Sequence, residues 1–198
     1  AASGWPTRTR QAMDMGFASN FYHQGADNIY VFNHFEKFTN VMPTNEMQTV
    51  FANISDREAV SRFERRHILT WRETSVEGQF AESPYPGEIP VGSAAAVRIN
   101  LGEKTSGRVA KLVMGLTRPV SLEIWCNTVK CGTLKPIETP KVGYPQGNKE
   151  NPTYYYELEL PSGATHDGWN VFDFHNVGEK AVGRDAFIWT EVVIAAEK

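Results

Sequence analysis

From about residue 70 onward, apolar and polar positions alternate along the chain with a period of two. In the segment 94–102, Val97, Ile99 and Leu101 share one face, and in the segment 121–127 apolar side chains alternate with Glu123 and Trp125. This period is typical of strands with one buried face. Roughly seven such runs are separated by Gly, Pro and Asn, as in sandwich folds. The sequence therefore predicts a mainly β fold, a jelly-roll-like antiparallel β-sandwich.

The first part of the chain shows a helical period instead. Between residues 7 and 25, Met13, Phe17, Asn20 and Phe21 recur at helical spacing and predict one buried stripe. After a turn at Gly25, the almost continuous apolar run 29–32 predicts a short buried strand, as in a parallel sheet.

Two further helices are predicted before the sandwich. One runs from about Pro43, with Met47, Val50, Phe51 and Ile54 on its apolar face. The other follows the sequence "SDRE" at 55–58, which has the spacing of a capping box. The predicted buried side of this last helix is Ala59, Val60 and Phe63, and the predicted solvent side is Arg62, Glu64, Arg65 and Arg66.

The charge balance narrows the classes of partner. The chain has 198 residues, a net charge of −3 and a pI near 6.0. Nucleic-acid binding leans on clustered Lys and Arg, so no nucleic-acid partner is expected. No apolar run approaches the roughly 20 residues that span a bilayer, so no membrane partner is expected either. The chain begins with Ala1 rather than Met, which indicates a processed product or a fragment.

Several segments together resemble a known family. The sequence "GADNIYVFN" at 25–33 is similar to the pattern of the last barrel strand in a class of (β/α)8-barrel glycoside hydrolases and glycoside-hydrolase-like proteins. The segment 47–69 resembles the helix and linker that lead from that barrel into a C-terminal β-sandwich. The segments "AAVRINLG" and "SLEIWCN" resemble that sandwich and, more loosely, the jelly-roll domains appended to polysaccharide lyases.

The resemblance implies both an organisation and a function. Residues 1–68 would be a short α/β segment that ends the barrel, and residues 69–198 would be the appended β-sandwich. A whole barrel takes about 250 residues, so the catalytic carboxylates are expected outside this chain. The resemblance further implies a polysaccharide or oligosaccharide partner and an extracellular or periplasmic location. The rest of the barrel, or another chain, is expected to pack on residues 1–68.

Exposed Trp and Tyr side chains are the candidates for sugar contact, because the flat C–H surface of a pyranose stacks on an aromatic face. Strand alternation points Trp125 and Tyr155 away from the apolar side, which makes them the best placed. Asn33 and His34 follow the predicted buried strand and are candidates for contact with a sugar in the intact enzyme. The remaining candidates are Trp71, Tyr85 and Trp169. The alternative is that these aromatics fill the core and that the sandwich only braces the barrel.

Other chemistry has little support in the sequence. The five histidines lack metal-ligand spacing, and no metal or cofactor is expected. If residues 127–130 form a four-residue hairpin loop, Cys126 and Cys131 face each other and a disulfide is geometrically possible. The alternative is a pair of reduced, half-buried cysteines. A second functional hypothesis is a non-enzymatic sandwich for protein–protein interaction, with the N-terminal helices as its docking site.

Overall fold

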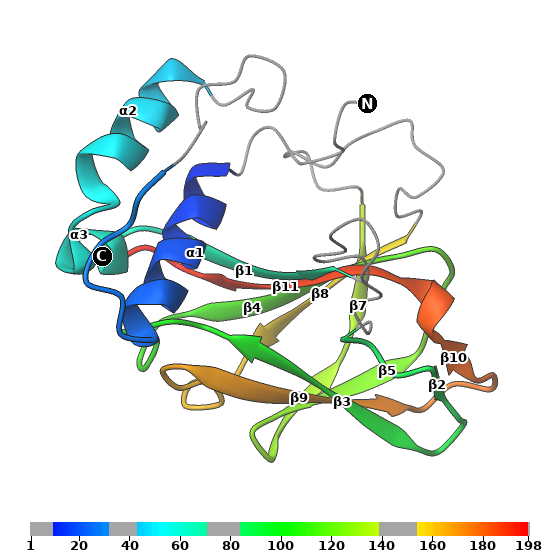
Figure 1. Ribbon diagram of the computed structural model, residues 1–198. Coiled ribbons are helices and arrows are strands. Elements are labelled where there is room, and N and C mark those ends of the chain that lie inside the picture. The colour runs from blue at the N-terminus through cyan, green and yellow to red at the C-terminus, as the bar shows by residue number, and fades with distance from the viewer. Residues whose placement is uncertain (1–9, 32–42, 71–83, 139–153, 198) are drawn as a thin grey trace.

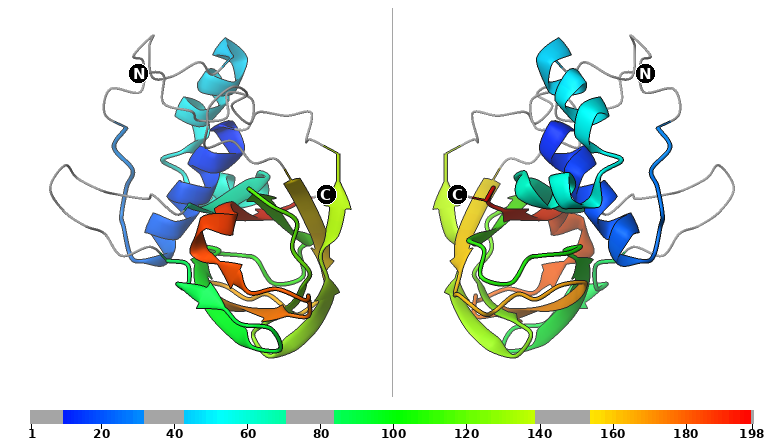
Figure 2. Two further views of the ribbon diagram at one scale, coloured as in Figure 1. Left: turned by 90° about the vertical axis from the view of Figure 1, so that its right-hand side faces the viewer. Right: turned by 90° about the vertical axis from the view of Figure 1, so that its left-hand side faces the viewer.

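The computed structural model describes residues 10–31, 43–70, 84–138 and 154–197, and the statements below concern these ranges. Two antiparallel sheets face each other as the layers of a β-sandwich, and the helices gather beside the edge strand β1 (Figures 1 and 2). The predicted mainly β, jelly-roll-like sandwich is therefore confirmed.

The helices are α1 Arg10–His23, α2 Thr44–Asn53, α3 Arg57–Arg62 and a 3-10 turn η1 Arg184–Ala186. The strands are β1 Arg65–Thr70, β2 Glu88–Ile89, β3 Ala94–Asn100, β4 Ala110–Leu116, β5 Leu122–Cys126, β6 Val129–Thr133, β7 Lys135–Ile137, β8 Tyr154–Leu160, β9 Trp169–Asn176, β10 Val182–Gly183 and β11 Phe187–Ile194. One sheet has the order β1-β11-β4-β8-β7, the other has the order β3-β9-β5-β6, and β2 pairs with β10.

The strand pairs are nested along the chain. The first strand pairs with the last, β2 with β10, β3 with β9, β4 with β8, and β5 with β6. This is the pattern of one long hairpin rolled into two layers, as in jelly-roll folds. Because every one of these pairs is antiparallel, each strand can present one face to the core and one to the outside.

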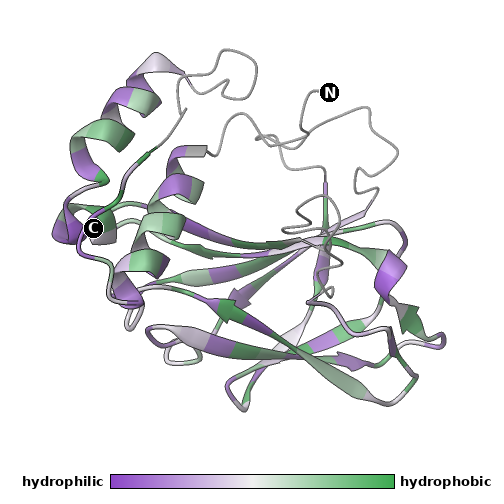
Figure 3. Ribbon diagram, viewed as in Figure 1, coloured by the Kyte–Doolittle hydropathy of each residue, from purple (hydrophilic) through white to green (hydrophobic). Residues whose placement is uncertain are grey.

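The main core lies between the two sheets. Val97, Ile99 and Leu101 share the buried side of β3, and Leu122, Ile124 and Cys126 share that of β5, as the period of two predicts. Apolar and polar colours alternate along these strands in Figure 3. The alternation leaves Glu123, Trp125 and their neighbours on the opposite, outward face.

Helix α1 packs against β1, and of the predicted stripe Met13 is buried whereas the two phenylalanines are not. Met15, Ala18 and Tyr22 are buried, whereas Phe17 is 50% and Phe21 is 51% exposed. The reason is the close approach at Gly16, where an added Cβ would lie 2.3 Å from the carbonyl oxygen of Arg66. This contact turns the face around Gly16 toward the sheet and leaves the two phenylalanines outside.

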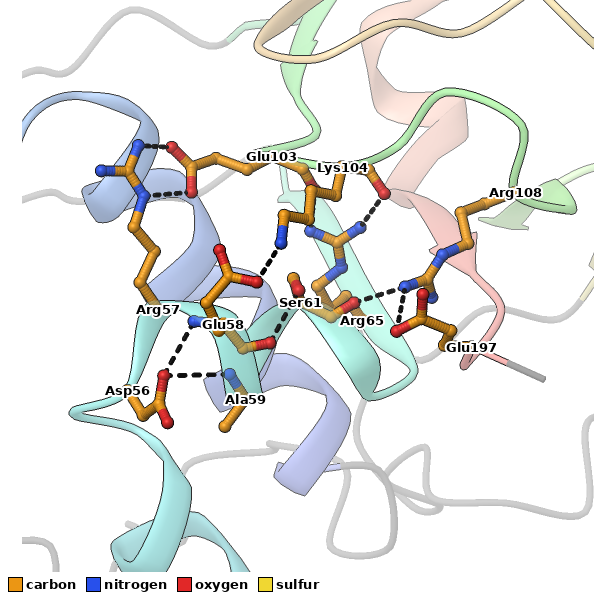
Figure 4. Close-up of polar contacts among 10 residues, drawn as sticks. All are labelled: Asp56, Arg57, Glu58, Ala59, Ser61, Arg65, Glu103, Lys104, Arg108 and Glu197. Atoms are coloured by element: carbon orange, nitrogen blue, oxygen red, sulfur yellow. Dashed lines mark hydrogen bonds and ion pairs between the residues drawn. The ribbon is translucent and has the colours of Figure 1, made fainter.

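Polar contacts fasten the short helix α3 to the turn after β3 (Figure 4). Asp56 caps this helix by accepting hydrogen bonds from the backbone N–H groups of Glu58 and Ala59, so the predicted cap at Ser55 is wrong by one residue. Arg57 pairs with Glu103, and Lys104 pairs with Glu58. The helix is therefore connected to the sandwich by two ion pairs, in which Glu103 is partly buried and the other three side chains are exposed.

Of the side chains predicted to lie on the solvent side of that helix, Arg62 and Glu64 are exposed, whereas Arg65 and Arg66 are buried in β1. The Arg65 guanidinium donates to Ser19 Oγ of α1 at 2.6 Å and to the carbonyl oxygens of Glu103 and Lys104. The Arg66 guanidinium forms a two-pronged ion pair with Glu191 of β11. The third helix ends at Arg62, and the strand that follows brings both side chains into buried polar contacts.

The predicted buried strand at 29–32 is wrong over its described part. Residues 25–31 form no regular element, and Tyr30 is 86% exposed. Ile29 and Val31 pack against the helical cluster around Tyr22 and Val50. Both apolar side chains are thus partly buried by helices rather than by neighbouring parallel strands.

Strand β1 runs across the predicted boundary between residues 68 and 69. Its six residues pair with β11 without interruption, from Arg65 opposite Ile194 to Thr70 opposite Trp189. The sandwich therefore includes residues 65–68, and the division into a barrel-derived part and a sandwich stays a prediction.

Candidate functional site

The outer face of the four-stranded sheet brings together two of the candidate sugar-binding residues. Trp125 of β5 and Trp169 of β9 both point outward, because Leu122, Ile124 and Cys126 fill the inner side of β5, and Phe172 and Phe174 fill that of β9. We call the surface formed by Trp125, Trp169, Arg98, Asp173, Glu123 and His175 the tryptophan face. Figure 1 shows this sheet on the side of the molecule away from the helices.

Trp125 lies at one end of the tryptophan face in a polar setting. Its indole N–H donates to Glu123 at 3.0 Å, and its ring lies 5.5 Å from that of His175, tilted by 36°. Lys130 of β6 pairs with the same carboxylate at 2.7 Å. The hydrogen bond from Lys130, and then that from Trp125, hold the pKa of Glu123 below its usual value. This carboxylate is therefore an ionised acceptor at neutral pH.

Trp169 lies at the other end and is 51% exposed. The guanidinium carbon of Arg98, on the neighbouring strand β3, lies 5.2 Å from its ring centroid. This is within the range of a cation–π contact, which orients both groups while leaving guanidinium N–H donors free to reach other acceptors. A second aromatic ring with a hydrogen-bonding cation beside it thus occupies the same sheet face.

The register sets the spacing between the two rings. Trp125 is opposite Asp173, which lies four residues after Trp169 on β9. Four residues span ~13 Å along a strand and adjacent strands lie ~5 Å apart, so the two Cα atoms are ~14 Å apart. Between the two rings, the same face carries Val171 of β9 and Arg98, which is opposite Val171 on β3. One apolar and one cationic side chain therefore separate the two aromatic platforms.

The exposed rings predicted for Tyr85 and Tyr155 are wrong. Tyr85 is 1% exposed, stacks on Phe187 with ring centroids 4.7 Å apart, and has its hydroxyl 2.8 Å from Thr190 Oγ1. Tyr155 does face outward from the five-stranded sheet, but it is 7% exposed because Trp189 and Val113 pack beside it. Neither ring offers an open face to a sugar.

The remaining sequence candidates have different outcomes. Trp71, Asn33 and His34 lie outside the described residues. Cys126 and Cys131 are free thiols, so the disulfide alternative is not formed and the reduced alternative holds. The expected four-residue loop is a two-residue turn at Asn127 and Thr128, which places Cys126 opposite Val129 rather than Cys131.

Sequence reasoning did not single out the polar partners of the two tryptophans. Glu123 could have been found, because it lies two residues before Trp125 and so on the same strand face. Arg98, Asp173 and His175 come from other strands, and only the cross-strand register brings them to the tryptophan face.

A hollow of about 350 Å³ lies on the outer face of the five-stranded sheet. Its charged lining includes the buried pair Arg66–Glu191 and the pair Lys111–Glu157, whose nitrogen and oxygen are 3.0 Å apart. Each carboxylate in these pairs already faces a cation. Opposite charges thus neutralise each other across this surface, and no aromatic ring lies open beside them among its lining residues.

Within the described ranges, no group of three or more His, Cys, Asp or Glu side chains could hold a metal ion. None of the described helices is both long enough and apolar enough to cross a membrane.

The fold and the tryptophan face define a β-sandwich with an open aromatic surface. No protein-family model matches the sequence, and no curated protein matches it. Two solved structures of the protein BuGH86 in complex with neoagarooctaose match over 66% of this chain and 18% of theirs, at 11% identity and a TM-score of 0.35. BpGH86A, a β-porphyranase of glycoside hydrolase family 86 from the human gut bacterium Bacteroides plebeius, matches over 68% of this chain and 21% of its own, at 17% identity and a TM-score of 0.41. The chain thus spans about a fifth of the length of these solved chains.

Proposed function

We propose that the tryptophan face binds carbohydrate. The observation that supports this most is the presence of two outward-facing indole rings, Trp125 and Trp169, on one open sheet face with ionised side chains beside each. A pyranose offers a flat C–H surface for an aromatic ring and hydroxyl groups for charged or polar partners. Arg98 and Lys130 can donate to hydroxyl oxygens, and Glu123 and Asp173 can accept from hydroxyl groups.

The direct test is titration of the chain with linear oligosaccharides while following tryptophan fluorescence and heat of binding. A suitable panel contains cellohexaose, laminarihexaose, xylohexaose and neoagarooctaose. We expect at least one series to bind, and Trp125→Ala or Trp169→Ala to weaken that binding at least tenfold, on the order of the 1–3 kcal/mol that desolvated aromatic contacts contribute.

Tyr154→Ala is the matched control, because Tyr154 is a 40% exposed aromatic residue on the other sheet. Its removal should leave the affinity unchanged. The absence of binding across the whole panel, or an equal loss in Tyr154→Ala, would overturn the assignment of the tryptophan face.

We further propose that this carbohydrate-binding sandwich belongs to a polysaccharide-acting glycoside hydrolase whose catalytic carboxylates lie outside the described sandwich. The support is the resemblance of the segment 25–33 and of the linker 47–69 to the end of a hydrolase barrel. Such a protein would meet its polysaccharide in an extracellular or periplasmic space. Detection of the chain in the exported fraction of its cells would support this location, and its confinement to the cytosol would contradict it.

A second candidate function is docking of the helical segment onto another folded part or chain. It is favoured by the exposed rings of Phe17, Phe21 and Tyr30, of which the first two lie one helical turn apart on α1. A photo-crosslinking phenylalanine analogue at position 17 should crosslink to sequence outside residues 1–198 in cells that express the natural gene. An analogue at Val129, which is exposed on the four-stranded sheet, is the control.

A further inference from the structure

Two asparagines connect the ends of the tryptophan face beneath its surface. Asn127 follows Trp125 by two residues, and Asn170 directly follows Trp169. The Asn127 side-chain amide donates to Asn170 Oδ1 at 2.7 Å. The two strand ends that carry the indole rings are therefore joined by a direct side-chain hydrogen bond.

Asn170 is fully buried and uses all of its hydrogen-bonding capacity. Its Nδ2 donates to the carbonyl oxygens of His166 and Gly168, both at 2.8 Å. Its Oδ1 accepts from the backbone N–H of His166 at 3.0 Å as well as from Asn127. A buried polar network that is fully satisfied holds one arrangement. This side chain therefore helps to hold the loop that precedes Trp169 in place.

Asn127 holds the other end by three contacts to β9 and its preceding loop. Its backbone N–H donates to the carbonyl of Val171 at 2.9 Å, and its Oδ1 accepts from the Val171 N–H at 3.0 Å. Its Nδ2 also donates to the carbonyl of Ala164 at 2.9 Å. Asn127 has φ +48° and Thr128 has φ +72°, as in a two-residue hairpin turn of the primed type. The turn after Trp125 is thus tied to the strand of Trp169.

We propose that Trp125 and Trp169 are the two ends of one site for an extended, linear saccharide, and that Asn127 and Asn170 are positioning residues that hold the two strand ends at the spacing set by the register. This inference rests on the proposed carbohydrate binding. The separation of ~14 Å is wider than a single sugar ring, so one ring cannot touch both platforms. The ligand class is therefore a stretch of polysaccharide chain rather than a monosaccharide or disaccharide.

The physical gain from fixed spacing is effective concentration. Once one part of a chain stacks on Trp169, the next contact at Trp125 is intramolecular, and its strength depends on whether the spacing matches the ligand. A loosened spacing lowers this advantage without changing either ring. The affinity for short ligands that reach only one ring should not depend on the hydrogen bond between Asn127 and Asn170.

The test compares long and short probes of whichever series binds, for example cellohexaose with cellobiose, or neoagarooctaose with neoagarobiose. Wild-type protein should bind the long probe at least about tenfold more tightly than the short one. Asn127→Gly keeps a residue that tolerates φ +48° and removes the side-chain link. We expect this variant to lose about tenfold in affinity for the long probe and less than twofold for the short one.

Thr128→Gly is the matched control, because it changes the same turn and leaves both asparagines in place. It should retain the full preference for the long probe. A solely structural role of Asn127 would weaken both probes alike, so the dependence on chain length separates positioning from general destabilisation. Near-ultraviolet circular dichroism establishes whether Asn127→Gly keeps the native packing of its tryptophans.

A double-mutant cycle on Trp125→Ala and Trp169→Ala gives a second measurement that does not need the asparagine variant to fold. The two losses should be non-additive for the long probe and independent for the short one. Additive losses for the long probe, or equal affinities of the wild type for both lengths, would overturn the single-site inference while leaving carbohydrate binding intact. If no probe of any series binds, the proposed function and this inference fall together.

Discussion

The outer faces of the two sheets carry similar residue types in opposite environments. On the five-stranded sheet, Trp189 and the pair Arg66–Glu191 are almost completely buried. On the four-stranded sheet, Trp169 is half exposed, and Glu123 pairs with Lys130 at a position open to solvent. An indole ring and an ion pair therefore help to hold the structure on one face and remain accessible to a ligand on the other.

The difference shows that composition alone does not distinguish a packing surface from a binding surface. A buried ion pair must balance the desolvation of both charges, and removal of one partner is costly. An exposed pair contributes little to stability, so its charges can exchange partners with a ligand. The following experiments test whether the two faces differ in this way.

The largest effect is expected for Glu191→Ala on the five-stranded sheet. The change leaves the buried Arg66 guanidinium without the carboxylate that it contacts at 2.8 Å. We expect a loss of about 3–5 kcal/mol in the free energy of unfolding, measured by urea denaturation. Glu123→Ala on the tryptophan face is the control and should hardly move the urea midpoint. Equal shifts in the two variants would remove the contrast between the faces.

A smaller loss is expected for Gly16→Ala, at the contact between α1 and β1. The added methyl carbon would lie 2.3 Å from the Arg66 carbonyl oxygen, so backbone must move. We expect a loss of about 2 kcal/mol, because overpacking outweighs the better helix propensity of Ala. Gly87→Ala is the control, since the nearest atom to its added Cβ is 3.9 Å away. A neutral Gly16→Ala would show that the helix can slide on the sheet.

The strands and their buried sides could be predicted because a period of two assigns each side chain to a face. The outward direction of Trp125 and Tyr155 follows from that rule. The same rule does not show which side chains cover a face. Tyr155 is buried by Trp189, which lies 34 positions later in the chain. The partners Arg98 and Asp173 of the candidate site likewise depend on cross-strand register. The buried side of helix α1 was predicted incorrectly for the same reason, because the contact of Gly16 with β1 decides which side of α1 is buried.

The next expected effect is a pH dependence that arises from His67 in β1. Burial, and then the positive charge of Arg65, lower the pKa of His67 to about 3. In the unfolded chain this histidine takes up a proton below about pH 6.5, whereas in the folded protein it stays neutral down to about pH 3. The folded state therefore loses about 1.4 kcal/mol for each pH unit below 6.5.

Denaturation between pH 6 and pH 4 measures this contribution by comparison with His67→Leu, which lacks the titrating group. Wild-type stability should fall more steeply than that of the variant. Parallel slopes of wild type and His67→Leu would mean that His67 is protonated without unfolding.

The smallest expected effect is a gain, from Thr128→Gly at the turn next to Trp125. Thr128 is a β-branched residue at φ +72°, where such side chains are strained. Glycine adopts this conformation freely, so the change should stabilise the protein by about 1 kcal/mol in urea denaturation. Strain of this kind tends to be kept at functional sites, and here it lies beside the candidate binding face. A loss of stability in Thr128→Gly would mean that the threonine side chain makes contacts that outweigh its strain, and the turn would then belong with the packed face rather than the open one.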